Sequence, residues 1–202
     1  MASMGAPVRL TESQVMMAAI VLARAFMEDA GTVYMIPDPV ERTRLLPPLF
    51  APLIRLAIAH GEAHTTANAE SIALWLPPDG STPADADMAA AGIGDAIEQM
   101  GQEITGRMVN LNTHLETVHA AMMPEAHWRL SFLGVEPERQ GQGVGGALIQ
   151  LMLDRIAAAG ETCYLETLEA RTIPFYERHG FRVVNESDVP ESAVHVWAMR
   201  TG

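Results

Sequence analysis

The sequence is poor in cysteine, in basic residues and in aromatic side chains. Its single cysteine, Cys163, cannot form an internal disulfide, a pattern typical of reducing compartments. Lys and Arg number 13 against 25 Asp and Glu, giving a net charge of −12, and the basic residues are scattered. Because phosphate backbones are bound by clustered positive charge, we expect no nucleic-acid partner. An acidic surface favours a cationic ligand such as a protonated amine, although it also serves solubility.

A long apolar run is also missing from the sequence. The N-terminal apolar segment 15–26 contains Arg24 and is too short to cross a bilayer. No basic segment precedes it, as a secretory signal would require. Together with the lone cysteine, these features predict a cytoplasmic protein without a membrane segment or a membrane partner. The length of 202 residues suits one α/β domain with a substantial core.

The N-terminal half has a mixed pattern of elements. Val8 to Leu10 predicts a short strand and Thr11 a helix start, with Met16, Ile20, Ala23 and Met27 on one helix face. A helical stretch over 40–60 contains Pro47, Pro48 and Pro52, so we expect it to be kinked or broken. Segments 62–66 and 71–76 predict a hairpin around Asn68, and 77–81 a loop. Residues 87–123 predict helix, broken near 101–106.

The C-terminal half alternates strands with helices. Strands are predicted at 128–135, 163–168, 181–184 and 194–199, and helices at 143–159 and 173–178. This alternation predicts an α/β fold with a mixed sheet covered by helices.

A glycine-rich turn joins the first of these strands to its helix. The turn contains Gly141, Gly143, Gly145 and Gly146, and the following helix is apolar at every third or fourth position. Without side chains in the turn, backbone N–H groups can close on an anion, and the helix N-terminus adds partial positive charge. A phosphate or pyrophosphate is the expected ligand.

Several phosphate-binding classes could use such a turn. A P-loop is excluded because no Lys-Ser or Lys-Thr follows the glycines. Residues 141–146 match the dinucleotide pattern Gly-x-Gly-x-x-Gly, but no further βαβ unit follows the next strand. A structural connection without a ligand is a third alternative, although packing alone does not require four glycines.

The remaining pattern is Gln140-x-x-Gly143-x-Gly145 after a strand that ends in Leu133-Gly134-Val135. It resembles the acetyl-CoA pyrophosphate loop of the GNAT superfamily of N-acetyltransferases. Segment 173–181 resembles the short helix and turn of that family. The order of sequence landmarks over nearly the whole chain resembles that of the puromycin N-acetyltransferase-like branch. Landmarks of this order are Val8-Arg9, Ala25-Phe26, Ala73-Leu74-Trp75, Trp128-Arg129-Leu130, Leu165-Glu166-Thr167 and Trp197-Ala198-Met199.

The resemblance implies a GNAT fold, with a mostly antiparallel sheet whose one parallel pair is splayed at the acetyl-CoA site. It implies a single domain over 1–202, the N-terminal half on the acceptor side and about 127–202 on the acetyl-CoA side. The residues implied to bind acetyl-CoA are Leu133, Gly134, Val135, Arg139, Gln140, Gly141, Gln142, Gly143, Val144, Gly145, Gly146, Thr172, Phe175 and Tyr176. Thr172 stands where the family often has Asn, and it is expected to cap the helix that begins at Ile173.

The resemblance also assigns Tyr176 as the general acid, since a phenol can protonate a departing thiolate. Glu166 and His127 are the candidate bases, and water or direct capture of a neutral amine are alternatives. For the acceptor we expect an aromatic wall from Phe26, Tyr34, Trp75 and Trp128.

No metal is expected, because the histidines at 114, 119 and 127 lack carboxylates at ligand spacing. The predicted function is acetyl transfer from acetyl-CoA to the amine of a small molecule. The alternatives are a non-catalytic CoA-binding regulatory domain, and transfer of a longer acyl group or transfer to oxygen. Dimers are common in the family, so a homodimer is left open.

Overall fold

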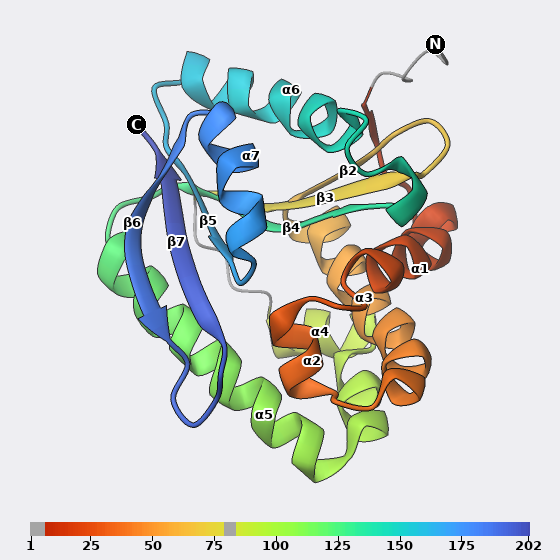
Figure 1. Ribbon diagram of the computed structural model, residues 1–202. Helices are drawn as coiled ribbons and strands as arrows, with labels where there is room; N and C mark the ends of the chain where they lie inside the picture. The colour runs from red at the N-terminus through yellow and green to blue at the C-terminus, as the bar shows by residue number, and fades with distance from the viewer. Residues whose placement is uncertain (1–6, 79–83) are drawn as a thin grey trace.

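The computed structural model describes residues 7–78 and 84–202 (Figure 1). Seven strands of the described chain form one sheet in the order β1-β2-β3-β4-β5-β7-β6. Their bounds are β1 Val8–Arg9, β2 Glu62–Thr65, β3 Ser71–Leu76, β4 Trp128–Val135, β5 Cys163–Thr167, β6 Phe181–Asp188 and β7 His195–Thr201. All neighbours are antiparallel except β4 and β5, so the mixed sheet expected from the sequence is confirmed.

Helices cover both faces of the sheet (Figure 1). They are α1 Val15–Ala25, α2 Ala30–Met35, α3 Pro39–His60, α4 Asp85–Ala91, α5 Ile93–Met122, α6 Val144–Ala158 and α7 Ile173–Arg178. Short 3₁₀ turns lie at Glu12–Gln14, Pro137–Arg139 and Ala170–Thr172. In the described part of the chain, no helix is long and apolar enough to cross a membrane.

Strand β3 shows how the two faces are filled. Ile72 and Leu74 pack into a core with α1 and α3, whereas Ala73 and Trp75 pack into a core with α6. Successive side chains of a strand point to opposite faces, and here both faces are covered. On the β5–β7 half, Tyr164 and Ala198 pack against Val118 of α5.

Two expectations about the N-terminal helices were wrong. In α1, Met16 and Ile20 of the expected face are exposed, whereas the buried residues are Val15, Ala18, Ala19, Val21, Leu22 and Ala23. Helix α3 runs from Pro39 to His60 through its three internal prolines, so the break is contradicted and the kink stays a prediction. Burial of Leu46, Phe50 and Ile54 against the core stabilises α3 by enough to offset the hydrogen bonds that proline removes.

The other boundaries agree closely with the sequence. The predicted hairpin is formed by β2 and β3, and the predicted break in the long helix lies at Gly101, whose φ is +72°. Strand β6 is longer than expected, ending at Asp188. Part of the predicted 77–81 loop lies outside the described residues. Cys163 is buried in β5, and burial raises the pKa of its thiol to about 12.

Candidate active site

A cavity of about 910 Å³ lies where β4 and β5 diverge. Its walls come from α1, α2, α3, α5, β4, the end of β5, α7 and the turn that precedes α6. The parallel pair is joined only at Trp128–Cys163 and Arg129–Tyr164. Beyond Arg129, the backbone N–H and C=O groups of β4 on this side are therefore not hydrogen-bonded to β5, and they face the cavity.

An irregularity in β4 marks the point of divergence. Leu74 pairs with Phe132 and Trp75 pairs with Leu130, so Ser131 is an extra residue in the ladder. A bulge of this kind bends a strand and turns its side chains. Ser131 lines the cavity, and its buried hydroxyl has no hydrogen-bond partner in the described structure. Such an orphaned polar atom fits a site that a polar ligand completes.

The glycine turn forms one end of the cavity. Gly141 and Gly143 have φ of +71° and +82°, values that L side chains rarely adopt, and a Cβ on either would meet nothing within 4 Å. Gly143 is the N-cap of α6, provides no side-chain cap, and leaves the first-turn amides for a ligand. A Cβ on Gly145 would lie 3.1 Å from Val135 Cγ2, and one on Gly146 would lie 2.8 Å from His179 Nε2. The backbone N–H groups of the first turn of α6, which no side chain caps, fit a pyrophosphate.

Most of the predicted acetyl-CoA residues line this cavity, with two exceptions among the described residues. Gly134 instead packs on α1, where a Cβ would lie 2.6 Å from Leu22 Cδ2. Gln142 donates from Nε2 to Glu138 O at 2.8 Å. Gln140 and Arg139 do line the cavity, although Gln140 Nε2 donates to Val135 O and Arg139 Nε donates to Glu70.

Helix α7 brings Phe175 and Tyr176 to the same cavity. The two rings meet edge to face at 5.0 Å, and Tyr176 also contacts Phe181 at 5.9 Å. Burial raises the pKa of Tyr176, and the nearby charge of Asp29 raises it further. The phenol is therefore protonated at neutral pH, as a proton donor must be.

Thr172 lies at the cavity but does not cap α7 with its side chain. Its hydroxyl donates to Glu169 O at 2.8 Å and accepts from the Thr167 hydroxyl at 2.7 Å. The expected side-chain cap was wrong, because the Thr172 oxygen accepts from the Thr167 hydroxyl instead of from a backbone N–H of α7.

Glu166 lines the cavity as part of a buried ion pair with Arg129. Arg129 Nη2 lies 3.1 Å from both carboxylate oxygens of Glu166, whose side chain is 8% exposed. Burial raises the pKa of Glu166, and the charge of Arg129 opposes this rise. With both oxygens engaged, Glu166 is better placed to orient groups in the cavity than to take up a proton freely.

Loss of the Glu166 carboxylate is expected to destabilise the protein. Glu166→Ala leaves Arg129, 15% exposed, paired only with the exposed Glu116 among the described residues. We expect the free energy of unfolding in urea to fall by about 3 kcal/mol, because an uncompensated charge stays buried. Glu41→Ala, which breaks the exposed pair with Arg44, is the control and should cost below about 1 kcal/mol. Equal losses in the two variants would contradict the assigned role of burial.

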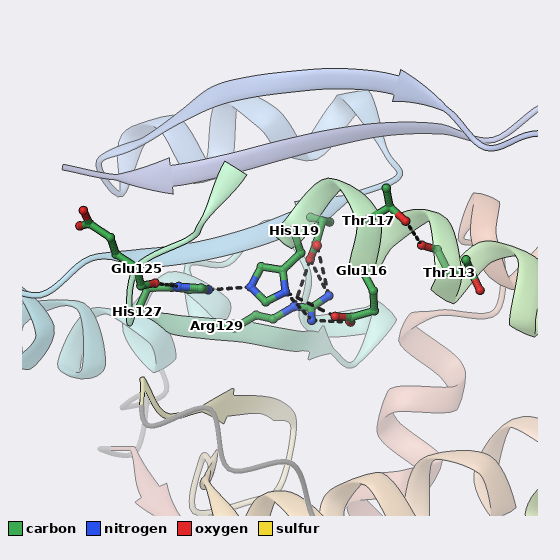
Figure 2. Close-up of polar contacts among 8 residues, drawn as sticks. Thr113, Glu116, Thr117, His119, Glu125, His127 and Arg129 are labelled. Atoms are coloured by element: carbon green, nitrogen blue, oxygen red, sulfur yellow. Dashed lines mark hydrogen bonds and ion pairs between the residues drawn. The ribbon is translucent and has the colours of Figure 1, made fainter. Parts of the chain in front are cut away.

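His127 lies outside the cavity wall. Figure 2 shows His119 between His127 and Arg129. The two imidazoles join Nε2 to Nε2 at 2.6 Å, and His127 Nδ1 lies 2.6 Å from Glu125 O. The Glu125 carbonyl can only accept, so His127 donates from Nδ1 and, when neutral, accepts from His119 at Nε2. Burial lowers the pKa of His127, but the structure gives it no access to the cavity.

The aromatic residues expected on the acceptor side are mostly placed elsewhere. Only Phe26 lines the cavity among the described residues. Trp75 is fully buried in the core beneath α6, and Trp128 donates from Nε1 to Glu161 under Arg155. Tyr34 accepts a hydrogen bond from Asn110 and packs beside Leu111. These three positions were wrong because tertiary packing decides which side chains line the cavity, and the local sequence pattern does not reveal that packing.

The structure adds an apolar wall to the cavity. The rings of Phe26, Phe50 and Phe132 lie 5.5 to 5.7 Å apart around one part of the cavity. Further apolar lining comes from Met35, Leu46, Leu49, Leu53, Ile97, Met108 and Leu115. Phe50 and Phe132 carry no local motif, so only their meeting in the fold identifies them.

No group of three His, Cys, Asp or Glu side chains that could hold a metal ion occurs in residues 7–78 and 84–202. The family model "Acetyltransferase (GNAT) domain" matches residues 96–183, which include β4, the glycine turn, α6, β5 and α7. This segment of the chain is similar to the GNAT acetyltransferases. The matching segment thus includes the glycine turn that was identified from the sequence.

The individual proteins to which the chain is similar are distant. A curated relative, the uncharacterized N-acetyltransferase YjcF of Bacillus subtilis (strain 168), is 24% identical over 79 residues, 39% of this chain and 56% of YjcF. A solved Corynebacterium glutamicum structure, described as histone acetyltransferase HPA2 and related acetyltransferase, has a TM-score of 0.64 at 21% identity, covering 98% and 96% of the two chains. A mosquito arylalkylamine N-acetyltransferase-like 5b structure has a TM-score of 0.63 at 11% identity, covering 96% and 98%. These likenesses confirm the GNAT fold.

Proposed function

We propose that this protein transfers an acetyl group from acetyl-CoA to the amine of a small, partly apolar molecule. The observation that carries the proposal is the placement of the uncapped glycine N-terminus of α6 and the protonated Tyr176 on one cavity. When bound, acetyl-CoA supplies a thioester carbonyl. The first-turn amides of α6 hold its pyrophosphate, and the free backbone of β4 beyond Arg129 holds its pantetheine arm and polarises the carbonyl.

The acceptor side of the cavity supports the choice of amine. The Phe26, Phe50 and Phe132 wall suits an apolar body, and the Asp29 and Glu169 carboxylates at the same cavity suit a cationic head. The mosquito structural neighbour is named for arylalkylamines, a class with these two features. We further propose a single domain over 1–202.

The test is a calorimetric titration with acetyl-CoA, with free CoA and NAD as matched controls, followed by a screen of amines with a thiol-release assay. Binding of acetyl-CoA but not NAD, together with turnover of arylalkylamines above simple diamines, is the expected result. Binding without turnover of any amine would favour the regulatory CoA-binding alternative. Lack of acetyl-CoA binding would overturn the proposal.

A further inference from the structure

Asp29 is a carboxylate of the cavity wall that none of the sequence motifs includes. It follows α1 and is the N-cap of α2. Its Oδ1 accepts from the N–H groups of Gly31 at 3.0 Å and Thr32 at 3.2 Å. Its Oδ2 has no hydrogen-bond partner in the described part of the chain. One oxygen therefore fixes the side chain in place, and the other is left for a ligand.

The position of Asp29 is held from two sides. A Cβ on Gly31 would lie 2.5 Å from Leu168 Cδ1, so α2 begins in close contact with the segment that follows β5. Glu169 of that segment accepts from Ala30 N–H at 3.0 Å. The same segment leads into α7 and Tyr176, so Asp29 and the phenol are carried by parts that contact each other.

The charge environment of Asp29 suits proton uptake near neutral pH. Burial raises the pKa of Asp29 to about 6; the Thr32 hydrogen bond opposes this rise and the charge of Glu169 adds to it. Arg171 lowers the pKa slightly, but Arg171 is itself paired with Glu169 at 3.1 Å. Tyr176 of α7 lines the same cavity as a neutral phenol. A base is most effective when its pKa lies near the working pH.

We propose that Asp29 is the general base of the transfer inferred above, an assignment that rests on that proposed function. Asp29 Oδ2 takes one proton from the bound ammonium, R–NH₃⁺, leaving a neutral amine with a free lone pair. The amine nitrogen bonds to the thioester carbon and the carbon–sulfur bond breaks. The departing sulfur takes the Tyr176 proton, and the phenolate recovers one from the amide nitrogen. The proton on Asp29 is the one released to solvent.

The other acidic and basic groups at hand are less suited to this step. Glu166 has both oxygens bonded to Arg129, and Glu169 is held by Ala30 N–H and by Arg171. His127 does not reach the cavity. Asp29 thus combines a free oxygen with a fixed place on the cavity that the acid also lines.

The experiment compares Asp29→Asn with Asp38→Asn. Asn keeps an oxygen for the two cap hydrogen bonds, so α2 should stay folded. Asp38 caps α3 in the same manner, through Val40 and Glu41 N–H groups at 2.7 and 3.0 Å, and is outside the cavity. For an alkylamine acceptor at pH 7.5, we expect Asp29→Asn to lower kcat/KM about 100-fold and Asp38→Asn to leave it within about twofold.

Two further measurements sharpen the test. The acidic limb of the kcat/KM profile, expected near pH 6 in the wild type, should disappear in Asp29→Asn and persist in Glu166→Gln. With an arylamine that is neutral at the assay pH, the kcat/KM of Asp29→Asn should fall by less than about fivefold, because no proton has to be removed before attack. Carbon-13 NMR of the acetyl-CoA-free protein should show an Asp carboxyl titrating near pH 6 that is missing in Asp29→Asn.

The outcomes separate the two proposals. An active Asp29→Asn variant with a normal acidic limb, or loss of that limb in Glu166→Gln, would overturn the role of Asp29 and leave the transferase proposal standing. A wild-type protein that turns over no amine would overturn the transferase proposal and the role of Asp29 with it. A larger loss with the neutral arylamine than with the alkylamine would also contradict a proton-accepting role.

Discussion

Gly145→Glu is expected to abolish acetyl-CoA binding while the fold is retained. Gly145 is buried in the first turn of α6 and lines the cavity beside Val135 and Phe175. A Glu side chain there must displace Val135 Cγ2, which would lie 3.1 Å from the new Cβ, and it brings a negative charge to the amides that await a pyrophosphate. We expect the Kd for acetyl-CoA to rise at least about 1000-fold by calorimetry.

The control for this change is Gly106→Glu. Gly106 lies in α5 with ordinary helical φ, and a Cβ there would meet nothing within 4 Å. The Gly106→Glu substitution adds the same charge to an already acidic protein. Any general effect of net charge on the binding of an anionic ligand therefore appears in both variants. Acetyl-CoA affinity within about twofold of wild type is expected for Gly106→Glu. Retained binding in a folded Gly145→Glu variant would remove the glycine turn from the phosphate site.

The sequence predicted the C-terminal half well because local chemistry determines its boundaries. The strand at 128–135 and the helix at 173–178 were placed as the structure has them, and the glycines set the start of α6 within one residue. Gly143 and Gly141 must adopt positive φ, and Pro174 sits at an early helical position where it is tolerated. In such cases the residue type itself decides the backbone.

The acceptor side was predicted poorly because tertiary packing determines it. Trp75 looked like a binding aromatic, but β3 is covered on both faces, so its side chain is fully buried. The prolines of α3 predicted a break, whereas the buried face of that helix holds it together. Phe26, Phe50 and Phe132 come from three separate elements and meet only in the folded chain.

Asp29 illustrates the limit of motif-based reasoning. An Asp before Ala-Gly-Thr is an ordinary helix N-cap, and the structure confirms that it caps α2. Its place on the cavity that Tyr176 also lines depends on the packing of Gly31 against Leu168, a contact between residues more than 130 positions apart. An N-cap in a cavity wall can thus have a second role that no sequence signal separates from the first.

Tyr176→Phe is expected to lower kcat about 1000-fold and to leave the affinity for acetyl-CoA within about threefold. The Phe ring preserves the contacts with Phe175 and Phe181, so only the phenolic proton is lost. General acid catalysis contributes about 10² to 10⁴ in rate, and Tyr176 is the one tyrosine of the described residues that lines the cavity. Steady-state kinetics and calorimetry measure the two effects separately.

The matched control is Tyr34→Phe, which also removes a phenol. The Tyr34 hydroxyl accepts from Asn110 Nδ2 at 2.9 Å and lies outside the cavity lining. Its loss should change kcat below about twofold, although it removes a hydrogen bond. An unchanged kcat in Tyr176→Phe, or an equal fall in Tyr34→Phe, would contradict the assignment of the acid.

The order of proton transfers follows from the electrostatic effect of Asp29 on Tyr176. While Asp29 is ionised, its charge raises the pKa of the phenol and makes proton donation harder. Once Asp29 has taken the ammonium proton, that charge is gone and the phenol becomes a stronger acid at the moment when the sulfur departs. The same reasoning predicts a lower pKa for Tyr176 in Asp29→Asn than in wild type, which ultraviolet titration of the phenol can measure. Base and acid are then coupled through their electrostatic interaction, and the amine is deprotonated before the thiolate is released.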